Sequence, residues 1–62
     1  MKRYWMITYE WCNQRISYKN TILANLHPYK VCKKLQEATN VEVTISIIFS
    51  MEITEKEYFD MI

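Results

Sequence analysis

Val41-Glu42-Val43-Thr44-Ile45-Ser46-Ile47-Ile48-Phe49-Ser50-Met51-Glu52-Ile53 is the stretch that decides the fold. Every odd-numbered position in it is apolar, and the even-numbered positions are polar except for Ile48. An alternation with a period of two is typical of a strand that buries one face and leaves the other in water. Strands of this half-buried kind favour antiparallel pairing. We therefore expect a strand from Val41 to Ile53 in an antiparallel sheet, with all its odd positions on the buried face.

An earlier stretch, from Tyr4 to Trp11, alternates in the same way. One of its faces carries Trp5, Ile7, Tyr9 and Trp11. This aromatic row is either the inner face of the sheet beneath a helix or an exposed recognition surface, and we favour the first interpretation. On the opposite face, Tyr4, Met6 and Ile48 would then form a small apolar patch that is left for a partner.

The segment that follows the first strand is polar and predicts a turn over residues 12–15. Because the chain contains no glycine, Asn13 is the best candidate for a left-handed backbone conformation there. A second strand is expected somewhere between Ile16 and Leu26. The alternative is a loop from Asn13 to Asn20, followed by a shorter strand from Thr21 to Leu26.

Two helices complete the expected fold. His27-Pro28 marks the start of the first, because proline is favoured at the first helical position, where its missing N–H costs nothing. This helix runs through Tyr29 to Thr39, and Asn40 is expected to end it in a left-handed conformation. Thr54-Glu55-Lys56-Glu57 matches a capping box, in which the side chains of Thr54 and Glu57 bond each other's backbone N–H groups. A short terminal helix is expected from that point.

The predicted architecture is a single α+β domain over residues 1–62, in the order strand, strand, helix, strand, short helix. We expect a three-stranded, mainly antiparallel sheet with the first helix packed on one face and the first strand in the centre. A strand of thirteen residues would span roughly 43 Å, which is longer than the first strand can pair. A bend near Ser50 could divide the strand within one chain, but the unpaired edge also invites the same edge of another copy, so we expect a homodimer. Its candidate edge is formed by Val43, Ile45, Ile47, Ile48 and Phe49.

Length and composition narrow the class of protein. Half of the 62 residues are hydrophobic, which is typical of a packed domain rather than a disordered tail. The most apolar uncharged run, Val43 to Met51, falls short of the ~18 apolar residues of a membrane span. The basic start, Lys2-Arg3, leads into an apolar stretch that Glu10 closes before a signal-peptide core develops. We expect a cytoplasmic protein in which Cys12 and Cys32 are reduced, with a bridge between them as the alternative.

Catalytic residue patterns are missing from the sequence. The lack of glycine excludes phosphate-binding loops and nucleophile elbows. The one histidine, His27, precedes a proline at a helix entrance, where a structural role is expected. Cys12, Cys32 and His27 do not lie at the spacing of metal-ligand pairs. We expect no catalytic residue, no metal site and no cofactor.

Charge is segregated along the chain, although the net charge is only +1. Residues 1–36 hold seven basic groups against Glu10, whereas residues 37–62 hold six acidic groups against Lys56. Aromatic side chains among cations are typical of surfaces that hold single-stranded nucleic acid. The alternative is a solvated lysine face over an amphipathic helix, which we favour. The candidate contacts for nucleic acid or another partner are Arg15, Lys19, Lys30, Lys33, Lys34, Tyr4, Tyr18 and Tyr29.

Three segments together resemble short uncharacterised proteins encoded by phages and prophages of enteric bacteria. The segments are Tyr4-Trp5-Met6-Ile7-Thr8-Tyr9-Glu10-Trp11, His27-Pro28, and Met51-Glu52-Ile53-Thr54-Glu55-Lys56-Glu57-Tyr58. The chain departs from such proteins in lacking glycine in the hairpin region. The resemblance implies a bacterial cytoplasmic setting and a function in binding, and it carries over no active residues. We expect a non-catalytic protein-binding or regulatory module that acts on a host protein, and nucleic-acid binding is the alternative.

Overall fold

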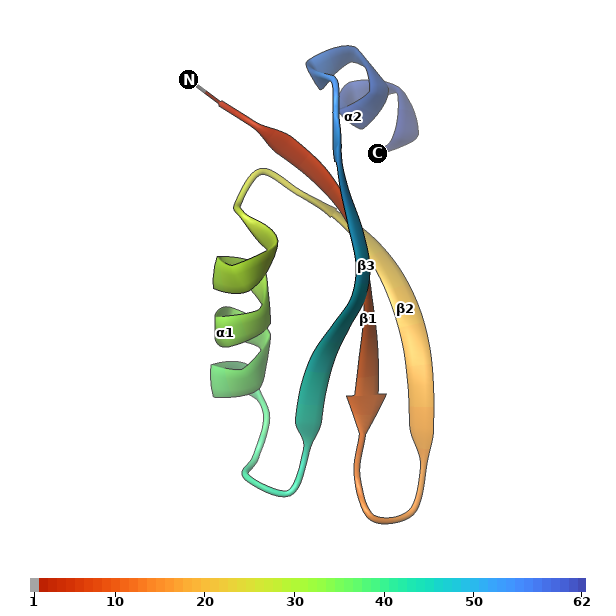
Figure 1. The fold of residues 1–62 in the computed structure, drawn as a ribbon, viewed down its shortest axis with the longest axis vertical. Helices are drawn as coiled ribbons and strands as arrows, with labels where there is room; N and C mark the ends of the chain where they lie inside the picture. The colour runs from red at the N-terminus through yellow and green to blue at the C-terminus, as the bar shows by residue number, and fades with distance from the viewer. Residues whose placement is uncertain (1) are drawn as a thin grey trace.

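The computed structural model describes residues 2–62 and has three strands and two helices. In chain order these are β1 (Tyr4–Cys12), β2 (Ser17–Ala24), α1 (Pro28–Ala38), β3 (Thr44–Ile53) and α2 (Glu55–Met61) (Figure 1). The predicted α+β class and element order are confirmed. The second strand follows the first of the two alternatives, since β2 begins at Ser17 and not after a long loop.

The three strands form one antiparallel sheet in the order β2-β1-β3. β1 pairs with β3 along the whole of β3, from Tyr4 opposite Ile53 to Cys12 opposite Thr44. The predicted overhang is therefore wrong. Its cause is the start of the strand, because Val41 lies in a turn that the Val43 N–H closes by bonding the Asn40 carbonyl (3.1 Å). The Val41 side chain is 99% exposed.

A bulge at Ile48 divides β3 into two halves. Tyr9 lies opposite Ile47 and Thr8 lies opposite Phe49, so Ile48 has no partner of its own on β1. An extra residue in a strand with a period of two moves every later side chain to the other face. The prediction that all odd positions share one buried face is therefore wrong. Val43, Ile45 and Ile47 face α1, whereas Phe49, Met51 and Ile53 lie on the opposite face.

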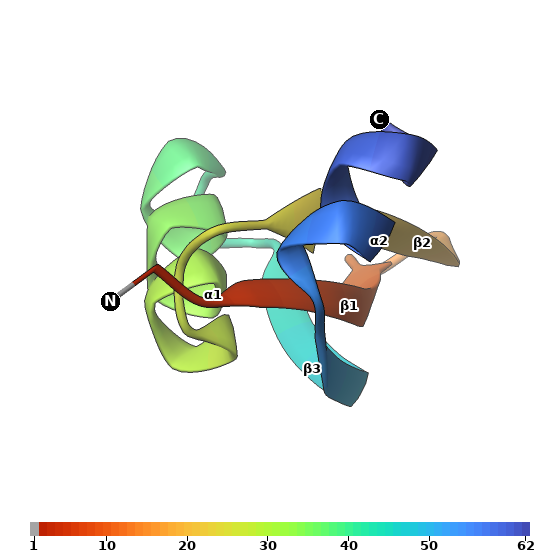
Figure 2. The same ribbon diagram turned by 90° about the horizontal axis from the view of Figure 1, so that it is seen from above.

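One helix packs against each face of the sheet, and Figure 2 shows α1 and α2 on opposite sides. Beneath α1, the core is centred on Tyr9, Val43 and Ile45, with Trp11, Ile22, Cys32, Leu35 and Ile47 packed against it. The aromatic row of β1 therefore belongs largely to the core, as predicted.

On the opposite face, α2 covers only the end of the sheet that carries Tyr4. The Tyr4 ring lies 4.5 Å from that of Tyr58 and 5.9 Å from that of Phe59, measured between centroids. Tyr4 is buried by these contacts. The predicted patch of Tyr4, Met6 and Ile48 is therefore wrong in its first member, because Tyr4 serves to anchor α2. Met6 is half-buried and Ile48 is exposed.

Asn13 and Asn40 stabilise their turns through their side chains and not through a left-handed backbone conformation. No residue of the described chain, from 2 to 62, has a positive φ, so the conformations predicted for Asn13 and Asn40 are wrong. The Asn13 side-chain oxygen instead accepts the N–H groups of Arg15 and Ile16, both at 2.8 Å. The Asn40 oxygen accepts the Glu42 N–H at 2.9 Å. Side-chain acceptors of this kind stabilise a turn that glycine would otherwise form.

The predicted helix starts are confirmed. Pro28 is the first residue of α1, and Nδ1 of His27 accepts the Tyr29 N–H at 3.1 Å. At α2 the Thr54 hydroxyl accepts the Glu57 N–H (3.1 Å) and the Glu57 carboxylate accepts the Thr54 N–H (3.0 Å). The Thr54 N–H holds the pKa of Glu57 below its usual value. The reciprocal bonds fix α2, which has only seven residues, to the end of β3.

Candidate interaction surface

Several exposed apolar side chains gather on the side of the sheet opposite α1. Residues that pair directly across antiparallel strands lie on the same face. Met6 pairs with both Leu23 and Met51, and Thr8 pairs with Phe49. We call the following set the apolar face: Met6, Leu23, Phe49 and Met51 of the sheet, with Phe59 of α2.

The apolar face is exposed because α2 is too short to cover it. The rings of Tyr58 and Phe59 in α2 contact Tyr4, at one end of β1, and Phe59 still remains largely exposed. Phe49 is therefore left 51% exposed, Met51 41% and Phe59 56%. Ile48, Met61 and Ile62 are exposed as well. Among residues 2–62, six of the ten exposed large hydrophobic side chains thus belong to residues 48–62.

The candidate dimer residues are divided by the bulge. Val43 and Ile45 are buried in the core beneath α1, and Ile47 is half-buried against it. Ile48 and Phe49 are exposed. A partner can therefore reach only the outer edge of β3 and the side chains from Ile48 onwards.

The candidate basic contacts fall into two groups rather than one surface. Lys30, Lys33 and Lys34 are exposed on α1 beside the exposed ring of Tyr29. Arg15, Tyr18 and Lys19 belong to the β1–β2 hairpin, where the Tyr18 ring stacks on Trp11 with 5.2 Å between centroids. In Figure 1 the hairpin turn lies at the end of the sheet away from the N-terminus of α1. Tyr4 is buried beneath α2 and belongs to neither group.

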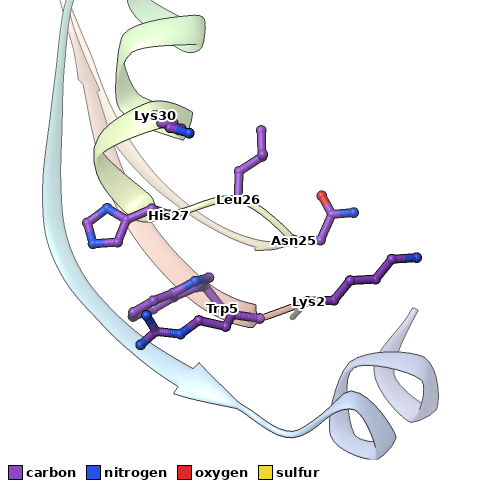
Figure 3. A pocket seen from close by; sticks show the side chains of 7 residues that line it. Lys2, Trp5, Asn25, Leu26, His27 and Lys30 are labelled. Carbon is purple, nitrogen blue, oxygen red and sulfur yellow. The ribbon is translucent and has the colours of Figure 1, made fainter.

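A shallow cavity of about 270 Å³ lies where the N-terminus of the chain meets the start of α1 (Figure 3). It is lined by Lys2, Arg3, Trp5, Asn25, Leu26, His27 and Lys30. Within the described residues, no acidic side chain lines it. Sequence reasoning missed this cavity, although the basic start of the chain and the His27-Pro28 pair were both visible.

Bonds within the chain already occupy much of that cavity's polar lining. Arg3 bonds Glu52 through two nitrogens, at 2.7 and 2.9 Å, and its guanidinium lies 5.1 Å from the centroid of the Trp5 ring. These bonds hold the pKa of Glu52 below its usual value. The first-turn N–H groups of α1 all bond to His27. Among the described residues that line the cavity, the side chains of Lys2 and Lys30 are the cations without such a bond.

Among residues 2–62, the thiols and carboxylates do not gather into a metal site. Cys12 and Cys32 are free thiols, whose sulfurs donate to the carbonyls of Asn13 and Ile45. In the part of the chain that the structure describes, no three histidine, cysteine or acidic side chains lie together as metal ligands. No helix among residues 2–62 has the length and apolar character needed to cross a membrane.

Comparison of the chain with protein-family models, with curated proteins and with solved structures found no significant match.

Proposed function

We propose that this chain is a small non-catalytic protein-binding module that binds its partner through the apolar face. The observation that carries the proposal is the exposure of Phe49, Met51 and Phe59 on one side of so small a domain. Soluble monomers rarely expose contiguous apolar patches larger than a few hundred Å², and patches rimmed by polar residues mark interaction sites. Aromatic side chains and methionine are also the residues enriched at the centres of interfaces.

The rim of the apolar face indicates the chemistry of the partner. α2 carries Glu55, Glu57 and Asp60 against the single cation Lys56. A partner that presents an apolar patch beside basic groups would complement both features. The resemblance to phage-encoded proteins supports a bacterial host protein as that partner.

Capture from bacterial lysate followed by reconstitution tests the proposal. The tagged chain is incubated with lysate, with and without nuclease, and retained proteins are identified by mass spectrometry. We expect one dominant protein that survives nuclease treatment. When purified, it should bind the chain directly in a calorimetric titration, with a heat-capacity decrease because apolar surface is buried. Loss of all retained material on nuclease treatment would contradict the proposal.

Nucleic-acid binding is the second candidate, and the cavity beside α1 is the observation that favours it. Lys2 and Lys30 line this cavity with the Trp5 ring, and Lys33 and Lys34 continue the exposed cations along α1. Cations beside an aromatic ring are the elements that hold a phosphate backbone and a stacked base. The proposal of protein binding is preferred because Arg3 is already paired with Glu52 and the other cations lie at the far hairpin.

A labelled single-stranded oligonucleotide decides this second candidate. If it is right, binding at low salt weakens steeply as salt is added, and changing Lys30, Lys33 and Lys34 to glutamate abolishes it. Lys56→Glu is the matched control, because Lys56 lies on α2, across the sheet from α1. If the oligonucleotide does not bind at low salt, the proposal of nucleic-acid binding is wrong.

A further inference from the structure

The outer edge of β3 is closed at both ends and open between them. In the first half, the Gln36 side chain of α1 donates to the Val43 carbonyl (2.6 Å) and accepts the Ile45 N–H (2.9 Å). The Cys32 sulfur donates to the Ile45 carbonyl. These bonds take the place of a neighbouring strand. At the other end, Thr54 begins the cap of α2. The open segment therefore runs from residue 47 to residue 53, and its midpoint is Ser50.

The register fixes which backbone groups of that segment point outward. The Asn13 N–H bonds the Ile16 carbonyl (2.9 Å), so the odd residues of β1 bond β2 and the even residues bond β3. Beyond the bulge, the even residues of β1 lie opposite Phe49, Met51 and Ile53. The N–H and C=O groups of Ser50 and Glu52 therefore point away from β1, toward the open side.

We propose that a second copy of this chain pairs antiparallel with this segment, about a two-fold axis that passes between the two Ser50 residues. In this register Phe49 lies opposite Met51 of the partner subunit, and the same contact occurs twice. The four side chains are neighbours on the apolar face, where sulfur and aromatic rings attract each other. The two sheets then form one continuous six-stranded sheet.

The monomer exposes more surface than its mass predicts. Its accessible surface is 4845 Å² at 7.6 kDa, whereas a compact monomer of that mass exposes about 4,300 Å². The excess, about 550 Å², is roughly 70% of the ~800 Å² that each partner buries in a standard interface. On the other sheet edge, the side chain of Asn20 occupies one outward group of β2, the Thr21 N–H (3.0 Å). We assign the copy to β3 because its open segment carries the exposed apolar side chains of Phe49 and Met51.

This inference goes beyond the protein-binding function. Edge pairing leaves the apolar face uncovered and joins two such faces side by side, so a dimer could bind its protein partner at both. The oligomeric state of the purified chain tests the inference without any partner.

Light scattering at tens of micromolar is the first test. We expect a mass of about twice 7.6 kDa for the wild type and a monomer mass for Ser50→Pro. Proline removes the outward N–H that the two-fold pair needs, and edge strands tolerate it where no bond to the neighbouring strand is lost. Far-ultraviolet circular dichroism checks that the variant is folded. A monomeric wild type, or a dimeric Ser50→Pro, would overturn the inference.

Cysteine cross-linking tests the register, and it decides the matter if Ser50→Pro fails to fold. In a chain with Cys12→Ala and Cys32→Ser, Ser50→Cys should form an intermolecular disulfide on mild oxidation. The two Cα atoms of such a pair lie about 5.5 Å apart, within the range of disulfides. Glu52→Cys is the control, because the two copies of that residue would lie roughly 13 Å apart. A cross-link through residue 52 and none through residue 50 would overturn the proposed axis.

Discussion

Ile7→Ala is expected to remove much of the free energy of unfolding of the chain. Ile7 is 0% exposed and is the one side chain of the described residues that is fully enclosed. It lies in the central strand, opposite Ile22 on β2 and Ser50 on β3. Truncating a buried isoleucine to alanine costs about 2–5 kcal/mol, and a domain of this size has a stability near the lower end of about 5–15 kcal/mol. The measurement is urea unfolding followed by tryptophan fluorescence.

Two substitutions calibrate that result. Ile7→Val should cost only about 0.5–1.5 kcal/mol, because it removes a single methyl group. Val41→Ala should leave the unfolding midpoint unchanged, since the Val41 side chain is in water. An Ile7→Ala midpoint equal to that of Val41→Ala would show that the core does not lie where we describe it.

The double variant Phe49→Lys and Phe59→Lys is expected to lose its protein partner. Each change places a charge against the apolar surface of the partner. Truncating a central aromatic residue of an interface typically costs about 2 kcal/mol or more of binding free energy. We expect affinity to fall at least roughly a hundredfold, which corresponds to about 2.7 kcal/mol. Titration calorimetry with the captured partner measures this, and the mass of the variant is determined alongside to separate a loss of dimer.

The matched variant carries Lys30→Glu, Lys33→Glu and Lys34→Glu on the opposite side of the sheet. Its Kd for the protein partner should lie within about threefold of the wild-type value, because charges outside the interface mainly change the association rate and contribute little to affinity. A partner that binds the double variant normally and rejects the lysine variant would place the interface on α1 instead.

The elements that the sequence predicted correctly all carry local signals. These signals are the alternation along β1 and β3, the His27-Pro28 pair at the start of α1 and the capping box at Thr54. Each depends on residues that are close together in the sequence. Such patterns can be interpreted correctly without knowledge of contacts between distant segments. The order β2-β1-β3 followed from the half-buried character of the strands and from short connections.

The bulge shows where alternation stops being informative. Ile48 was the one apolar residue at an even position, which is the visible trace of an irregularity in β3. The pattern contained no information on whether Ile48 was an exposed exception or an inserted residue. Because it is inserted, Phe49, Met51 and Ile53 lie on the side opposite to the predicted one. The apolar face, and with it the proposed function, depends on that single residue.

Contacts between distant segments account for the other differences. Tyr4 is buried because α2, at the other end of the chain, folds onto it. Gln36 closes part of the β3 edge although helical periodicity gives no reason to single it out. The basic residues chosen from the sequence separate into two groups because α1 and the hairpin are placed by the sheet and not by their charges.

Methyl spectroscopy of the methionines tests the central claim most directly. The apolar face includes Met6 and Met51, which lie opposite each other on β1 and β3. Their ¹³C-labelled methyl signals are followed while the captured partner is added to saturation. We predict that both signals shift or broaden while the ring signals of Tyr29, exposed on α1, stay in place. Unchanged methionine signals with a shifted Tyr29 would contradict the account and assign binding to α1.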